Sequence, residues 1–87
     1  MEVQTEIMFN SLLKSFVTNG LINLGVEMNP LTGKKEINLN QASFSIKMLE
    51  MIKKKTFGNL NKNETNTLQD SLTELKKKFV KISDNNQ

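Results

Sequence analysis

The stretch NPLTGKKEINLNQAS, Asn29 to Ser43, separates two helical patterns and decides how the chain folds. Pro30 fixes its own φ angle and disfavours a helical conformation at Asn29, while Gly33 can adopt a positive φ angle. Asn29, Pro30, Thr32 and Gly33 are therefore predicted to form a structural turn. A phosphate-binding loop would need an additional glycine, a Ser or Thr after its lysine, and a preceding strand. The sequence carries none of these three signals here.

A second helix is expected to follow this turn. Either Asn38 or Asn40 can cap it, because an Asn side chain accepts hydrogen bonds from the N–H groups of a first helical turn. Its main apolar face consists of residues at helical spacing: Ala42, Ile46, Leu49 and Ile52. Gly58 can take a left-handed conformation and end the helix. Gly58 and Asn59 are therefore predicted to form the second structural turn.

Methionine is frequent in and near this helix. Met48 and Met51, together with Phe44, flank its main face, and Met28 lies just before the turn. A flexible thioether suits an adaptable binding surface, but it also fills irregular gaps in a core. Core filling is the preferred interpretation of these three methionines.

Upstream of the turn, apolar residues recur at steps of three and four, which predicts a first helix. The apolar positions on its broad face are Phe9, Leu12, Leu13, Phe16, Val17, Leu21 and Leu24. Gly25 lies where a left-handed cap would end this helix. Gly20 costs roughly 1 kcal/mol relative to alanine in a helix interior. It is interpreted as a tolerated flaw or a kink, the alternative being the close approach of a second helix backbone.

The last third of the chain predicts a third helix. Asn61 and Glu64 form a capping-box pattern at its start. Apolar residues then alternate in steps of four and three, the spacing of coiled coils and left-handed bundles. The candidate self-association seam on this face is Leu68, Leu72, Leu75 and Phe79. The same side chains could instead close a bundle within one chain, and the spacing does not distinguish the two arrangements.

The chain has 87 residues, of which 37% are hydrophobic, and this suits one small domain. A chain of this length buries about 60–65% of the surface that it exposes when unfolded, so additional stabilisation is expected. Without Cys or His, the usual source that remains is self-association. The predicted fold is all-α, a three-helix bundle made of a helical hairpin and a third helix, with an ordered loop between the first two helices. Residues 1–82 are expected to form the domain and 83–87 a frayed tail.

Composition also limits the classes of function. The sequence has no Cys nucleophile and no His base, and its acidic residues are scattered. No catalytic, cofactor-binding or metal-binding residue is predicted, and the protein is not expected to be an enzyme. No apolar run approaches the roughly 20 residues that span a bilayer, and the N-terminus lacks signal-peptide features. The cytoplasm is therefore the expected location, with no membrane partner.

Two lysine runs are the candidate nucleic-acid contacts, since phosphate neutralisation drives non-specific binding. They are Lys53, Lys54, Lys55, Lys76, Lys77 and Lys78. Each run closes a helix, where positive charge is favoured by the helix dipole. No aromatic residue interleaves them for base stacking, and the chain has no Arg. A solvated surface is the preferred interpretation, so nucleic acid is a disfavoured partner.

The order of these turns and caps carries a resemblance. The matching segments are Leu24–Gly25, Asn29–Gly33, Ile37–Leu39 with Ala42, Met48–Leu49 and Lys55–Leu60. They resemble a family of short bacterial proteins catalogued as domain of unknown function 1844, over nearly the whole chain. Asn29 and Asn38 stand where that family usually carries Asp. The resemblance implies a compact, cytoplasmic, helical bacterial protein, and it implies no activity.

The leading hypothesis is a non-catalytic helical module that self-associates, with a homodimer favoured. It is motivated by the small core and by the seam of the third helix. An unidentified protein partner is compatible with the same hypothesis. The alternative is a weak, lysine-mediated nucleic-acid or ribosome-associated protein, whose affinity would fall steeply with salt.

Overall fold

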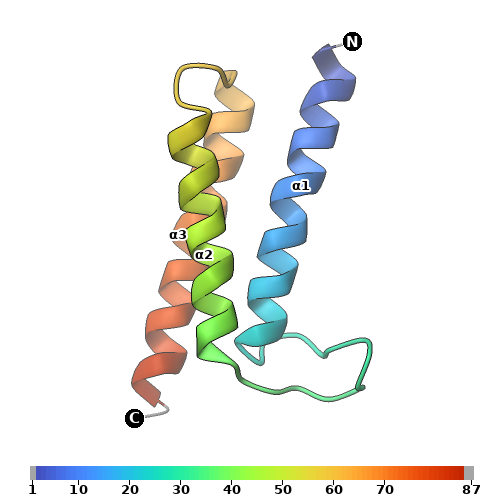
Figure 1. Cartoon of the computed structure of the whole chain (residues 1–87), viewed down its shortest axis with the longest axis vertical. Helices are drawn as coiled ribbons and strands as arrows, with labels where there is room; N and C mark the ends of the chain where they lie inside the picture. Colours follow the sequence, from blue (N-terminus) through green and yellow to red (C-terminus); the bar gives the residue numbers. More distant parts are fainter. Residues whose placement is uncertain (1, 86–87) are drawn as a thin grey trace.

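A computed structural model describes residues 2–85 and contains three helices, each antiparallel to the one before it (Figure 1). Their bounds are Glu2–Asn23 for α1, Leu39–Lys55 for α2 and Lys62–Asn85 for α3. Each helix packs against both of the others. Between residues 2 and 85 no strand forms, and pairing outside the helices is limited to isolated bridges such as Leu24 with Ile37. The predicted all-α three-helix bundle is confirmed.

The helix ends differ from the prediction in two places. α1 begins at Glu2, well before the apolar pattern that starts at Phe9. α3 continues past Ile82 to Asn85, so the predicted end of the helical domain at residue 82 is too early. The predicted frayed tail is therefore helical over residues 83–85, and residues 86–87 lie outside the described part of the chain.

The core lies along the line where the three helices face one another. Its buried apolar side chains are Leu13, Leu24, Ala42, Ile46, Leu49, Ile52, Leu68, Leu72 and Leu75. All four residues of the predicted main face of α2 are among them. Half-buried apolar side chains of α1 pack around this cluster, namely Phe9, Phe16, Val17 and Leu21. One stripe of each helix thus supplies the core, as amphipathic spacing predicts.

Gly20 lies at the point where α1 approaches both other helices. A Cβ atom at this position would lie 3.0 Å from Cδ2 of Leu75 in α3 and 3.5 Å from Cβ of Ser45 in α2. Both of those residues are 0% exposed. The interpretation of Gly20 as a tolerated flaw is therefore wrong. The glycine makes room for side chains of α2 and α3, so the atoms nearest to it are side-chain atoms and not the backbone of a second helix, which was the alternative.

The loop between α1 and α2 is held by the predicted turn residues. The N–H of Gly33 donates to the carbonyl oxygen of Asn29 at 2.8 Å, and Gly33 has a φ angle of 69°. The Asn29 side chain accepts from the N–H of Leu31 at 2.9 Å, which closes the turn around Pro30. The Thr32 hydroxyl accepts a longer bond, 3.3 Å, from the next N–H after Gly33. These contacts satisfy local backbone groups, so the structural assignment of this turn is confirmed.

The helix caps follow the sequence signals closely. The Asn38 side chain caps α2 by accepting from the N–H of Gln41 at 3.1 Å, so Asn38 and not Asn40 is the N-cap. At the start of α3, the N–H of Glu64 donates to the Asn61 side chain at 2.8 Å. The Glu64 carboxylate accepts from the N–H of Asn61 at 2.9 Å in return. This reciprocal pair is the predicted capping box.

The joint between α2 and α3 depends on Gly58, whose φ angle is 84°. Replacing Gly58 by alanine is expected to lower the free energy of unfolding by about 1–2 kcal/mol, because an L-residue is strained in this left-handed region. No heavy atom lies within 4 Å of the added Cβ, so the cost comes from the backbone alone. Urea denaturation measures it. Gly58→Asn is the control and should lose less, since Asn tolerates this conformation; equal stability of wild type and Gly58→Ala would contradict the assignment.

Candidate functional site

The acidic side chains do not gather into a site. Among residues 2–85, no three of them lie close enough together to hold a metal ion. Nor does that part of the chain contain a helix with the length and apolar character needed to cross a bilayer. The features that stand out on the surface are an exposed apolar area and a groove lined by lysines, which involve different sides of α2.

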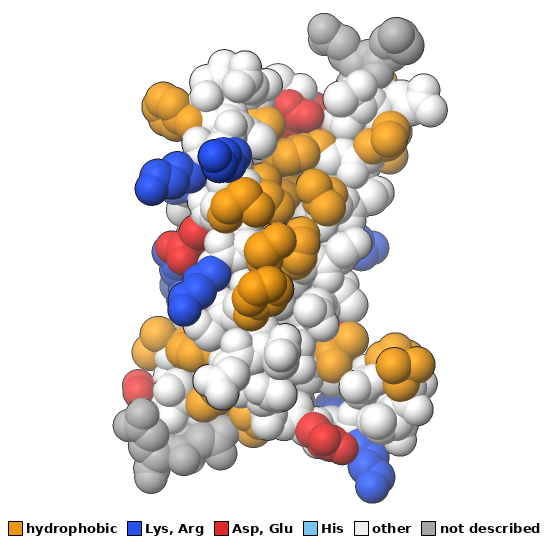
Figure 2. Space-filling view, in the orientation of Figure 1, with side chains coloured by type: hydrophobic (Ala, Val, Ile, Leu, Met, Phe, Trp, Pro, Cys, Tyr) orange, Lys and Arg blue, Asp and Glu red, His pale blue; other side chains and the backbone are white. Residues whose placement is uncertain are grey.

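The apolar face is made by Met8 and Leu12 of α1 with Phe44, Met48 and Met51 of α2. Exposed fractions are 66% for Met8, 46% for Leu12, 54% for Phe44 and 42% for Met51, while Met48 is half-buried. In Figure 2, hydrophobic side chains gather along the middle of the molecule, where Figure 1 places α2 beside α1. The side chains from α1 and those from α2 form one area because both sets lie along the boundary between the two helices.

Helical spacing and one hydrogen bond show on which side of α1 and of α2 the residues of the apolar face lie. Met8 and Leu12 precede Asn19 by eleven and seven residues, so all three lie on one side of α1. The Asn19 amide donates to the hydroxyl of Ser45 in α2 at 3.4 Å, so that side of α1 faces α2. On α2, the apolar face lies away from the residues that bond to α3, such as Lys53. The apolar face therefore spans the α1–α2 boundary.

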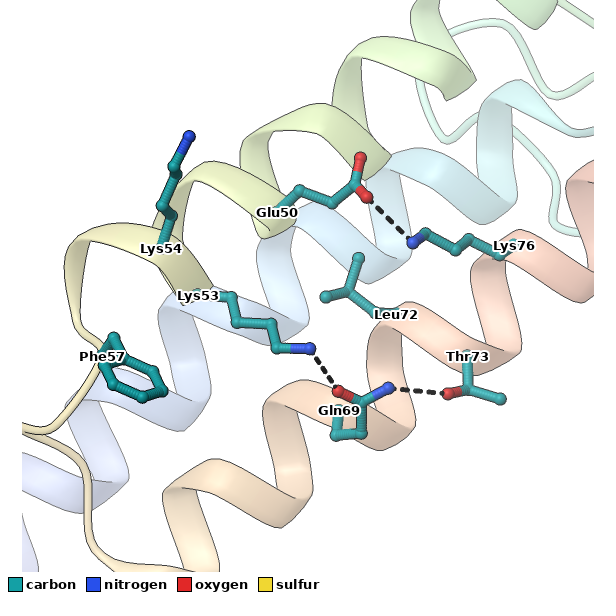
Figure 3. A pocket seen from close by; sticks show the side chains of 8 residues that line it. All are labelled: Glu50, Lys53, Lys54, Phe57, Gln69, Leu72, Thr73 and Lys76. Carbon is teal, nitrogen blue, oxygen red and sulfur yellow. Dashed lines mark hydrogen bonds and ion pairs between the residues drawn. The ribbon is translucent and has the colours of Figure 1, made fainter.

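The cationic groove is a hollow of about 500 Å³ between α2 and α3, close to their joint (Figure 3). It is lined by Glu50, Lys53, Lys54, Phe57, Gln69, Leu72, Thr73 and Lys76. A second hollow of about 290 Å³ shares Lys53, Phe57 and Gln69 with it and reaches Leu60 and Leu68. The two hollows thus continue into each other past Phe57, whose side chain is 86% exposed.

Polar bonds cross the cationic groove and tie α2 to α3. Lys76 Nζ lies 2.8 Å from Glu50 Oε2, and Lys53 Nζ donates to Gln69 Oε1 at 2.7 Å (Figure 3). Leu72, which is 2% exposed, lies beneath them. The lining holds three lysines and one glutamate, so two positive charges are in excess. Lys54 extends into solvent, and it forms no ion pair with any residue in the described range.

The predicted self-association seam lies inside the chain. Leu68, Leu72 and Leu75 are at most 2% exposed and belong to the bundle's own core, and Phe79 is half-buried against it. A second copy cannot contact the three leucines without unfolding α3 from the bundle. The assignment of these residues to an interface between copies is therefore corrected, and the seam closes the three-helix bundle.

The two lysine runs are partly brought together. Lys53 and Lys54 line the cationic groove with Lys76, whereas the other three lysines of the runs do not. Among those, Lys78 Nζ pairs with Glu74 Oε1 in its own helix at 2.9 Å. The two runs were predicted to be separate and without an aromatic neighbour. The structure differs in part, because Lys76 of the second run lines the same groove as Lys53 and Lys54, with Phe57 at the other end of the groove from Lys76.

The comparisons with known proteins agree with the turn and cap pattern. Neither curated proteins nor solved structures give a match to the chain. A family model described as Domain of unknown function (DUF1844) matches residues 6–81, which reach from the second turn of α1 nearly to the end of α3. The predicted resemblance is thereby confirmed, and the chain belongs to the DUF1844 family.

Proposed function

We propose that the protein is a non-catalytic, cytoplasmic interaction module that self-associates as a homodimer through the apolar face. The observation that carries this proposal is the exposure of Met8, Leu12, Phe44 and Met51, each more than 40% exposed, along one helix boundary. Contiguous apolar areas of several hundred Å² on a small protein mark interaction surfaces. Removing such an area from water stabilises a complex by roughly 25 cal/mol per Å².

A second copy of the chain is the occupant that best fits this surface. Two antiparallel helices present a broad, ridged face, and the same face on a twofold-related copy would complete a four-helix layer. Met8, Leu12, Phe44 and Met51 are uncharged, and the charged residues of α2 nearest to them, Lys47 and Lys55, lie at the border of the face. A small single-chain core also gains stability from a partner that binds only the folded state.

Composition supports the non-catalytic part of the proposal. The chain contains neither Cys nor His, so it has no thiolate nucleophile and no imidazole base. Polar side chains of the first turn and of the helix caps satisfy backbone groups, as those of Asn29 and Asn38 do. The polar residues with the best-defined geometry thus already have structural roles.

Wild-type protein at micromolar concentration is expected to have the mass of a dimer in light scattering. The double variant Leu12→Lys/Met51→Lys should have the mass of a monomer, because it places two charges in the proposed interface. Circular dichroism checks that the variant keeps its helices. Leu31→Lys is the matched control: Leu31 is 93% exposed but lies in the loop, so this variant should remain a dimer. A strictly monomeric wild type would contradict the proposal.

Weak nucleic-acid or ribosome association is the second candidate function. It is favoured by the presence of Lys53, Lys54 and Lys76 in one groove with the exposed ring of Phe57, since cations and one aromatic platform are what single strands use. We place it second because Lys76 is already paired with Glu50. The floor of the same groove is also apolar, which a phosphate backbone does not fill.

A further inference from the structure

The cationic groove is independent of the proposed dimer surface. It lies on the side of α2 that bonds to α3 through Glu50 and Lys53, whereas the apolar face lies on the side toward α1. A dimer formed through the apolar face would leave the groove open. A function for the groove therefore has to be argued from its own shape, lining and charge.

The shape of the groove suits a side chain better than a flat surface. Its volume of about 500 Å³ lies in the range of small ligand sites. Leu72 forms its floor, and Leu60 and Leu68 continue the apolar lining beyond Phe57. Phe57 would lose much of its 86% exposure when the groove is filled. An apolar side chain placed there would thus be buried between α2, α3 and this ring.

The charge at the rim selects for an acidic occupant. Lys53 Nζ bonds to a neutral amide, Gln69 Oε1, so its charge is not compensated by a carboxylate. Lys54 forms no ion pair within residues 2–85, and Lys76 is the only lysine of this rim that does. Carboxylates placed against Lys53 and Lys54 would make charge-assisted hydrogen bonds and would increase the rate of association.

We propose that the cationic groove binds an acidic peptide segment of a partner protein. One apolar side chain of the segment lies beside Phe57, over Leu60 and Leu68, and flanking carboxylates contact Lys53 and Lys54. A peptide supplies both the apolar group and the negative charges that the lining requires. A nucleic-acid backbone supplies only the charges and leaves the apolar lining at Leu60 and Leu68 unfilled.

The test uses fluorescence anisotropy with a fluorescein-labelled synthetic peptide in which glutamates surround two leucines spaced by one helical turn. It is expected to bind the wild-type chain saturably, with an affinity that falls as salt is added. The double variant Lys53→Glu/Lys54→Glu should bind about tenfold more weakly or worse, and Phe57→Ser should also weaken binding. The monomeric variant Leu12→Lys/Met51→Lys should bind like wild type, which separates this proposal from the dimer.

Lys34→Glu/Lys35→Glu is the matched control, because it makes the same charge change in the exposed loop between α1 and α2. It should retain the wild-type affinity within about twofold, as expected of charges outside the groove. Equal weakening by the two double variants would overturn the proposal, because only net charge would then matter. Unchanged binding of a peptide with both leucines replaced by serine, or no saturable binding, would overturn it too. Displacement of the peptide by mixed-sequence RNA at lower concentration would overturn it in favour of nucleic acid.

Discussion

Replacing Leu75 by alanine is expected to lower the free energy of unfolding by about 2–5 kcal/mol. Leu75 is 0% exposed and comes from α3 to the point where Gly20 of α1 and Ser45 of α2 meet. The rigid helices around it can close only part of the cavity left behind, so the lost contacts are not recovered. Because domains are stabilised by only about 0.05–0.15 kcal/mol per residue, this loss would remove much of the stability. Urea denaturation followed by circular dichroism measures it.

The matched control for this prediction is Leu31→Ala, which deletes the same atoms from a side chain that is 93% exposed. It should change the free energy of unfolding by at most about 0.5 kcal/mol. Wild-type stability in the Leu75→Ala variant would contradict the burial of the third-helix face. If the seam instead joined two chains, the cost of Leu75→Ala would fall as the protein is diluted, since the stability of an interface depends on concentration.

The turns and caps could be predicted from sequence because their causes are local. Gly25, Gly33 and Gly58 all have positive φ angles, as expected for two glycines that follow helical patterns and for one, Gly33, in the turn after Pro30. Asn38 and Asn61 cap helices through bonds that span three residues. A few neighbouring side chains determine such geometry, and no knowledge of the other helices is needed. The number and order of the helices followed from these boundaries.

The partner of each apolar stripe could not be predicted in the same way. The spacing of Leu68, Leu72 and Leu75 requires a covered face, but the same residues are covered whether the neighbour is in the same chain or in another.

The burial of the methionines was also not predictable from the sequence. They were expected to fill the core, yet Met28 is 55% and Met51 is 42% exposed, so that interpretation is wrong for both. Three helices have more apolar surface than one small bundle can enclose.

The cationic groove was missed because it depends on how α2 is rotated against α3. Successive helical residues point about 100° apart, so neighbours within one lysine run face different surroundings. Lys54 lines the groove while Lys55 does not, and Lys76 lines it while Lys77 does not. Phe57 directly precedes the predicted turn at Gly58 and Asn59. Its exposure follows from the tight joint at Gly58, and the sequence gives no direct signal for it.

Replacing Gly20 by valine is expected to lower the free energy of unfolding by about 1–3 kcal/mol, although valine is a better helix former than glycine. The new Cβ would lie 3.0 Å and 3.2 Å from the two Cδ atoms of Leu75, closer than ordinary contact, and the Cγ methyls would extend further into the core. α1 would have to move away from α2 and α3. Ser11→Val, at an exposed position of α1, is the control for the change to a β-branched residue and should cost at most about 0.5 kcal/mol.

A double-mutant cycle makes this prediction specific to the contact between Gly20 and Leu75. In the Leu75→Ala background, the valine would enter the space that the leucine has left, so its cost should shrink or change sign. The expected coupling is roughly 0.5–3 kcal/mol in the favourable direction, as for residues in direct contact. Additive losses from Gly20→Val and Leu75→Ala would mean that the two positions do not meet. The helices would then approach one another elsewhere, and both the core and the two surfaces that flank α2 would need a different arrangement.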